Sequence, residues 1–172
     1  SDHTAKNYLH HLEEAYLVFL IERFSYKKKE TLTENKKVYA ADTGLIRAVS
    51  FRFHEDISHL YENVVAVELL RRKAAQKETE IYYWKNALQE EVDFVVKQGL
   101  KVVQLIQVCY DISDEKTKNR EIRALLKASK ELRCKDLVVV TEDTDATVEV
   151  PWFGMKGKVR YTPLWKWLLT KP

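Results

Sequence analysis

Glycine is scarce in this sequence, and its scarcity excludes two ways of binding nucleotides. Only four of the 172 residues are glycine. A phosphate-binding P-loop needs two glycines five residues apart, followed by lysine and then serine or threonine. The only Gly-Lys pair is Gly157-Lys158, which Val159 follows, and Trp152 stands where the first glycine would be. The three-glycine fingerprint of dinucleotide-binding folds is also absent. These 172 residues therefore bind neither ATP nor NAD by either route.

Cysteine and long apolar runs are scarce as well. The two cysteines, Cys109 and Cys134, have neither the spacing of a metal site nor that of a disulfide framework, which favours reduced thiols and a cytoplasmic location. No apolar run approaches the roughly 18 residues that cross a bilayer, so we expect no membrane partner. The net charge of +3 is too small to argue by itself for nucleic acid.

What is present divides into two predicted modules, residues 1–52 and 53–172. In the first, apolar spacing predicts a helix over residues 4–16, a strand over 17–26 and a second strand over 36–40. A lysine-rich segment, 27–37, separates the strands. Helix, strand, basic loop and strand in this order are typical of the second half of a winged helix. We therefore interpret the first module as a partial winged helix.

The second module alternates helices and strands in an informative order. The pattern predicts a helix at 54–76, strands at 80–84, 91–96 and 101–109, a helix at 114–132 and an apolar strand at 136–141. Short strands at 147–150 and 158–161 and a closing helix at 163–169 follow. Short turns make the first three strands an antiparallel meander, and the crossover helix favours a parallel fourth strand. This αβββαβ order predicts an α/β fold with a restriction-endonuclease-like mixed sheet.

Nucleases of that fold place two or three carboxylates and a lysine around Mg²⁺. The pattern is an Asp on the second strand and, roughly ten to fifteen residues later, Glu-x-Lys on the third, where residues two apart share a face. Here Glu91 and Asp93 share a face of the second strand, but Gln107 and Cys109 stand at the Glu and Lys positions. The candidate residues of a relic pocket are Glu62, Glu68, Glu91, Asp93, Gln107 and Cys109.

Two interpretations of these residues stay open. If the site is active, Asp93, Glu91 and Glu68 would hold Mg²⁺, and a migrated lysine, Lys85 or Lys97, would supply the ammonium. In the alternative, Asp93 only pairs with a neighbouring lysine, and Glu68, which lies within an apolar helical stripe, is a buried acid with a structural partner.

The basic segment between the first two strands allows two interpretations too. Its five lysines suit contact with phosphate, but a solvated hairpin tip also needs charge. The candidate nucleic-acid-binding residues are Lys27, Lys28, Lys29, Lys36 and Lys37.

Several segments together resemble a known family and cover most of the chain. They are Tyr8-Leu9-x-x-Leu12-Glu13-Glu14-Ala15-Tyr16-Leu17, Lys37-Val38-Tyr39-Ala40-Ala41-Asp42-Thr43-Gly44-Leu45, Leu60-Tyr61-Glu62-Asn63-Val64-Val65-Ala66-Val67-Glu68-Leu69, Tyr82-Tyr83-Trp84-Lys85, Glu91-Val92-Asp93-Phe94-Val95-Val96 and Pro163-Leu164-Trp165-Lys166-Trp167-Leu168. This set resembles the C-terminal region, a domain of unknown function, of a large prokaryotic family of AAA+ ATPases.

The resemblance implies an ATPase, which would bind ATP, upstream of Ser1, then a winged helix and a restriction-endonuclease-like domain. Many members carry Glu-Val-Lys where this sequence has Gln107-Val108-Cys109. We therefore expect an accessory domain without catalysis of its own. It would act with the upstream AAA+ module in cis and bind DNA or a protein partner. A Mg²⁺-dependent nuclease and a pure protein-interaction module are the alternatives.

Overall fold

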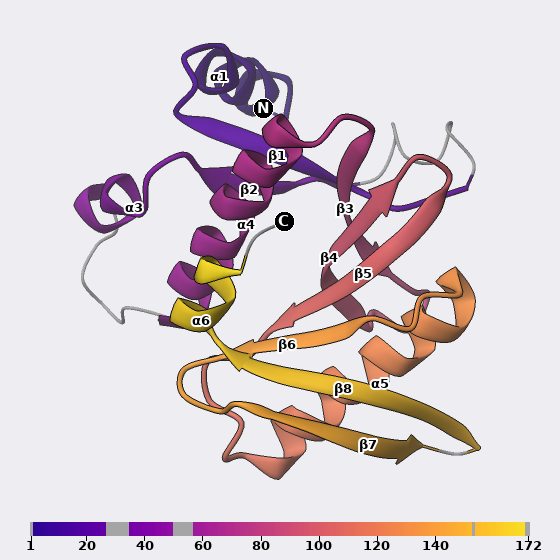
Figure 1. The fold of residues 1–172 in the computed structure, drawn as a ribbon. Helices are drawn as coiled ribbons and strands as arrows, with labels where there is room; N and C mark the ends of the chain where they lie inside the picture. The colour runs from indigo at the N-terminus through magenta and orange to yellow at the C-terminus, as the bar shows by residue number, and fades with distance from the viewer. Residues whose placement is uncertain (1, 27–34, 50–56, 153, 171–172) are drawn as a thin grey trace.

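A computed structural model describes residues 2–26, 35–49, 57–152 and 154–170. Within these residues eight strands form one mixed sheet, in the order β2-β1-β3-β4-β5-β6-β8-β7, and five helices lie around it (Figure 1). The prediction of an α/β fold with a mixed sheet is confirmed. None of the helices in the described ranges is long and apolar enough to span a membrane.

The N-terminal part is a helix, a hairpin and a short helix. Its elements are α1 (Asp2–Glu14), β1 (Val18–Arg23), β2 (Lys37–Ala40) and α3 (Thr43–Val49). β1 and β2 pair antiparallel, as expected for a hairpin. Lys27, Lys28 and Lys29 lie outside the described residues. The strand β1 also pairs in parallel with β3, through Glu22 opposite Tyr82 and Arg23 opposite Tyr83. The hairpin therefore extends the sheet of the following module.

The second part follows the predicted order closely. Its elements are α4 (Ile57–Ala75), β3 (Thr79–Lys85), β4 (Glu91–Gln98), β5 (Lys101–Val108), α5 (Glu115–Leu132), β6 (Leu137–Thr141), β7 (Ala146–Trp152), β8 (Met155–Pro163) and α6 (Leu164–Leu169). The pairs β3–β4 and β4–β5 are antiparallel, and α5 crosses over to make β6 parallel to β5. Asp114 caps α5, accepting hydrogen bonds from the backbone N–H groups of Lys116 and Thr117.

Helices cover both faces of the sheet, which explains why its central strands are apolar on both sides. On one face α4 and α6 pack with Val65, Leu69 and Trp167 against the sheet. On the other face α5 packs with Leu125 and Leu126. In Figure 1, α4 and α6 lie in front of the sheet and α5 lies behind it.

The hairpin also contacts α4, and this contact places the site. Ile21 and Tyr39 from the hairpin are buried in the same apolar cluster as Val65 of α4. The side chain of Asn63 holds the edge strand: its amide donates to the carbonyl of Ala40 and its oxygen accepts from the Ala40 N–H, both at 2.9 Å. The strand β2 therefore runs beside the first half of α4.

Candidate functional site

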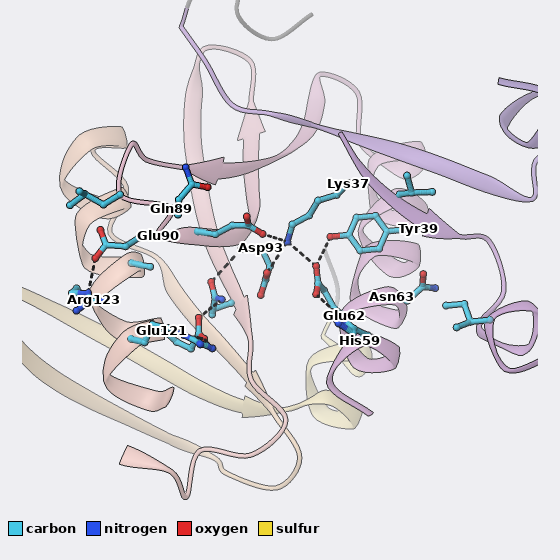
Figure 2. A pocket seen from close by; sticks show the side chains of 17 residues that line it. Lys37, Tyr39, His59, Glu62, Asn63, Gln89, Glu90, Asp93, Glu121 and Arg123 are labelled. Atoms are coloured by element: carbon cyan, nitrogen blue, oxygen red, sulfur yellow. Dashed lines mark hydrogen bonds and ion pairs between the residues drawn. The ribbon is translucent and has the colours of Figure 1, made fainter. Parts of the chain in front are cut away.

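A cavity of about 710 Å³ opens where β4 begins and β5 ends, between α4 and α5 (Figure 2). Six elements, β2, α3, α4, β4, β5 and α5, and the turn before β4 contribute to its walls. Its polar and charged lining residues are Lys37, Tyr39, His59, Glu62, Asn63, Gln89, Glu90, Glu91, Asp93, Gln107, Arg120, Glu121 and Arg123. This set contains four of the six residues predicted for the relic pocket.

Three carboxylates in this cavity converge on one ammonium group. Lys37 Nζ lies 2.6 Å from Glu91 Oε1, 2.9 Å from Glu62 Oε1 and 3.0 Å from Asp93 Oδ1. Figure 2 shows the Lys37 side chain reaching in from the hairpin, with Glu62 on α4 at one side and Asp93 at the other. We call Lys37, Glu62, Glu91 and Asp93 the carboxylate–lysine cluster. It joins β2, α4 and β4.

The position of Lys37 follows from the alternation of β2. Lys37 and Tyr39 are two residues apart in the strand and so share a face. Tyr39 is buried, and its hydroxyl donates to Glu62 Oε1 at 2.6 Å. The Tyr39 ring packs against Phe94 below the cluster. The apolar core therefore orients β2 so that Lys37 points into the cavity.

Asp93 sits at an irregularity of the sheet. The register places one residue of β3, Tyr83, opposite two residues of β4, Asp93 and Phe94, which is a β-bulge. The regular pairing of β4 with β5 ends at Phe94 opposite Ile106. Asp93 then joins the two strands with its side chain, because its Oδ2 accepts the N–H of Val108 at 2.9 Å. The Asp93 carboxylate is thus held in place by backbone.

Gln107 reaches the same region from β5. It is 4% exposed. Its Oε1 accepts from the backbone N–H of Asp93 at 3.3 Å, and its Nε2 donates to Glu121 Oε2 of α5 at 2.6 Å. Arg120 donates to the other oxygen of Glu121. The amide that replaces the expected glutamate therefore brings a helical carboxylate toward Asp93.

The charges of the cluster affect one another strongly. Burial lowers the pKa of Lys37, but Asp93, Glu62 and Glu91 raise it by more, so the pKa lies above its usual value and the ammonium stays charged. Burial raises the pKa of Asp93 to about 7, and the charge of Glu62 raises it too, while Lys37 and the Val108 N–H oppose both. Burial also raises the pKa of Tyr39, which stays a hydrogen-bond donor.

The arrangement does not fit Mg²⁺. This ion requires six oxygen ligands at about 2.0–2.1 Å, whereas the carboxylate oxygens here surround a nitrogen. Gln107 offers an amide where a second strand carboxylate would be needed, and that amide is occupied by Glu121. Among the residues that the structure describes, no group of three or more His, Cys, Asp or Glu side chains is placed to hold a metal ion.

Two predicted pocket residues lie elsewhere. Glu68 is not among the cavity residues. It is buried on α4 and pairs with Arg71 and Arg72, each at 2.7 Å. The hydrogen bond from Arg71, with that from Arg72, holds the pKa of Glu68 below its usual value. Cys109 is buried among apolar residues under α5, and its thiol donates to the carbonyl of Asp111 at 3.2 Å. Glu68 therefore matches the structural interpretation of a satisfied buried acid.

The predicted lysines are also distributed differently. Lys36 pairs with Glu22 at 2.7 Å on the surface, while Lys37 is occupied by the cluster and is 21% exposed. Of the two lysines proposed to have migrated, Lys85 reaches Glu91 Oε2 at 3.3 Å, but Lys97 pairs with Glu80 away from the cavity. Among the described residues, the lysine that contacts Asp93 is Lys37, which was predicted to contact phosphate.

Several lining residues were not predicted for the pocket from the sequence, and two of them, Lys37 and Glu121, bring charge closest to Asp93 and Gln107. Lys37 was named for another role, and Glu121 was not named at all. The alternation of Lys37 with Tyr39 indicates that both side chains share a face. The parallel pairing of β1 with β3, which places the hairpin and its strand β2 beside α4, has no local signal in the sequence. Glu121 lies one position before the buried Ile122 on α5, and its contact with Gln107 depends on how the helix packs.

Comparison with known proteins establishes the family. The chain belongs to the DUF4143 family, a domain of unknown function whose model matches residues 58–155. A second domain of unknown function, DUF8612, matches residues 1–56. The boundary between the two models lies close to the predicted module boundary at residue 52.

The relatives found among curated proteins are longer than this chain. An uncharacterized protein of Methanocaldococcus jannaschii is 36% identical over 166 residues, which are 95% of this chain and 36% of that protein. An uncharacterized protein of Haemophilus influenzae is 27% identical over 114 residues, which are 66% of this chain and 27% of that protein. The chain thus spans about a third or less of the length of these relatives.

Proposed function

We propose that this chain is a C-terminal accessory domain of an AAA+ ATPase, with a restriction-endonuclease-like core that binds its partner without catalysis. The observation that carries the proposal is the carboxylate–lysine cluster, in which an ammonium lies where a nuclease would hold a metal. Gln107 and Cys109, at the positions of the expected Glu and Lys, support it because neither can serve Mg²⁺ chemistry as those residues do.

The fold and the family support the same proposal. The elements α4, β3, β4, β5, α5 and β6 stand in the αβββαβ order of the proposed core. Domains of this family often lie C-terminal to an AAA ATPase. The curated relatives are long enough to contain one, because this chain matches only 36% and 27% of their lengths. The proposal includes an AAA+ ATPase upstream of this chain and the interpretation of the β1–β2 hairpin as the wing of a winged helix.

The test combines cleavage and binding. The purified chain is incubated with plasmid and with single-stranded DNA in Mg²⁺ or Mn²⁺, beside the variant Asp93→Ala. We expect no cleavage by either protein. Binding to labelled DNA is measured in parallel over a range of salt concentrations, since phosphate contacts produce a steep salt dependence. Cleavage that disappears in the variant would overturn the proposal, whereas absent or salt-independent DNA binding would assign the domain to a protein partner.

A Mg²⁺-dependent nuclease is the second candidate, and one observation favours it. Lys37 and Glu121 bring an ammonium and an additional carboxylate to Asp93 from outside the expected strand positions. Such a nuclease would require Lys37 to release at least part of the carboxylate cluster. In that case the wild type cleaves DNA and Lys37→Met abolishes cleavage, whereas Lys166→Met, which alters an exposed lysine paired with Asp145, leaves it unchanged.

A further inference from the structure

The lysine and the carboxylates of the cluster lie in segments matched by two different family models. Lys37 lies in the segment matched by the first model, residues 1–56, and its three carboxylate partners lie within residues 58–155. An ammonium has three N–H donors, and each of the three has one carboxylate within 3.0 Å. Lys37 is therefore coordinated in the manner of a bound cation.

The carboxylates depend on this ammonium for their charge balance. Glu62 and Asp93 are 17% and 11% exposed in their side chains. Three acids gathered around one point repel one another unless a cation lies between them. The hydroxyl of Tyr39 and the N–H of Val108 contribute hydrogen bonds, but neither carries a charge. Of the other cationic groups near the cluster, Lys85 reaches Glu91 Oε2 at 3.3 Å, and the exposed His59 lies 3.8 Å from Glu62 Oε2. Both meet oxygens other than those that contact Lys37.

We propose that Lys37 is a built-in cation, whose ammonium fills the place of a divalent cation, so that docking of β2 and binding of a divalent cation at these carboxylates exclude each other. This inference rests on the proposed function, because it describes why the site is closed to metal-dependent catalysis. It assigns the N-terminal module a role in the site of the second module.

The distances from Lys37 Nζ to the carboxylates show that the ammonium occupies the space a divalent cation would need. The three carboxylate oxygens that contact Lys37 are 2.6 to 3.0 Å from its nitrogen, and a contraction of about 1 Å or less brings such oxygens to a hard divalent cation. A nitrogen and a metal ion cannot share that centre. Removing the ammonium leaves buried acids without compensation, which is costly unless another cation replaces it.

The experiment measures binding of Mn²⁺ alone, by its EPR signal and by calorimetry. Lys37→Met removes the ammonium and retains an unbranched apolar stem. Lys36→Met is the matched control, because Lys36 is the preceding residue and its ammonium pairs with Glu22, outside the cluster. The double variant Lys37→Met/Asp93→Asn removes one carboxylate of the opened cluster. We expect Lys37→Met to bind one Mn²⁺ at least about tenfold more tightly than the wild type and Lys36→Met, and the double variant to lose this gain.

Each remaining outcome decides the proposal. If Lys37→Met is folded and binds Mn²⁺ no more tightly than the wild type, the proposal is overturned. If Lys37→Met is unfolded in metal-free buffer, Mn²⁺ should restore its circular dichroism and thermal transition, because a ligand of the native state stabilises that state; failure to do so also contradicts the proposal. Failure of the proposed function is distinct, because it shows as DNA cleavage by the wild type.

Discussion

The Asp93 carboxyl group is subject to opposing interactions within the site. Its carboxylate accepts a backbone N–H from Val108 and an ammonium hydrogen bond from Lys37. It is 8% exposed and lies near the like charge of Glu62. Hydrogen bonds favour its ionised form, whereas burial and like charge favour its protonated form. The balance raises the pKa of Asp93 to about 7.

This shift predicts a pH dependence of stability that requires the Asp93 carboxyl group. Between about pH 4 and about pH 7 the native Asp93 holds a proton that the unfolded chain has released. Its contribution to stability is complete at the lower pH and is lost as the pH rises through that window. Asp93→Asn removes this contribution. As the pH rises through this window, we expect the free energy of unfolding of the wild type to fall relative to that of Asp93→Asn, by at most about 1.4 kcal/mol per pH unit.

Urea unfolding of both proteins from pH 4 to pH 8 measures this difference. The comparison with the variant is necessary because Glu68 and Glu90, whose pKa values lie below the usual range, give the wild type an opposite slope at lower pH. Parallel profiles of the two proteins would show that Asp93 does not titrate in this window.

Single residues also show how far sequence reasoning reaches. Glu91 and Asp93 were predicted to share a face, because strand periodicity fixes this relation locally. Glu62 was a candidate for the same pocket, beside Glu68. Lys37 was assigned to phosphate contact because its neighbours in sequence are lysines. Its actual partners lie 25 to 56 residues further along the chain, and no local pattern contains them.

Among the elements, α5 and β8 meet at a position where a side chain fits only if a core leucine moves. Gly157 of β8 packs against α5 so closely that an added Cβ would overlap Leu126 Cδ2 and lie 3.1 Å from Leu137 Cδ1. Both leucines are buried in the same cluster. The close approach of helix and sheet therefore favours glycine at this position.

Gly157→Ala is expected to lower the free energy of unfolding by about 1–3 kcal/mol, because the core has to shift to admit one methyl group. Lys156→Ala, at the preceding exposed position of the same strand, is the control and should change stability by no more than about 0.5 kcal/mol. Chemical unfolding followed by circular dichroism measures both variants. Equal stability of the two variants would mean that α5 moves away from β8 without cost.

Element prediction succeeded where periodicity and end signals agree. The helix predicted at 114–132 is found at Glu115–Leu132, capped by Asp114, and the strand predicted at 91–96 is found at Glu91–Gln98. The bulge at Asp93 and Phe94 has no sequence signal of its own, because it arises where β3 and β4 pair. The parallel pairing of β1 with β3 was also not predicted, because it joins strands across the module boundary.

At the scale of the whole molecule, two family models divide a chain that forms one sheet. The boundary at residues 56–58 lies at the start of α4, yet β1 pairs with β3 beyond it. Ile21 of the hairpin is 4% exposed and is buried with Val65 and Phe94 of the second module. Shared sheet, shared apolar cluster and the carboxylate–lysine cluster all link the two modules.

We therefore expect the two modules to unfold as one cooperative unit. Ile21→Ala in the first module and Leu125→Ala in α5 should each lower stability by about 2–5 kcal/mol and shift one and the same thermal transition. Val38→Ala is the control in the hairpin, because Val38 is 50% exposed; its effect should be within about 0.5 kcal/mol. Calorimetry checks this result, since a two-state transition has equal calorimetric and van't Hoff enthalpies. Two separate transitions, of which Ile21→Ala moves only one, would show that the hairpin module unfolds independently and that Lys37 is free to leave the carboxylates without loss of the rest of the sheet.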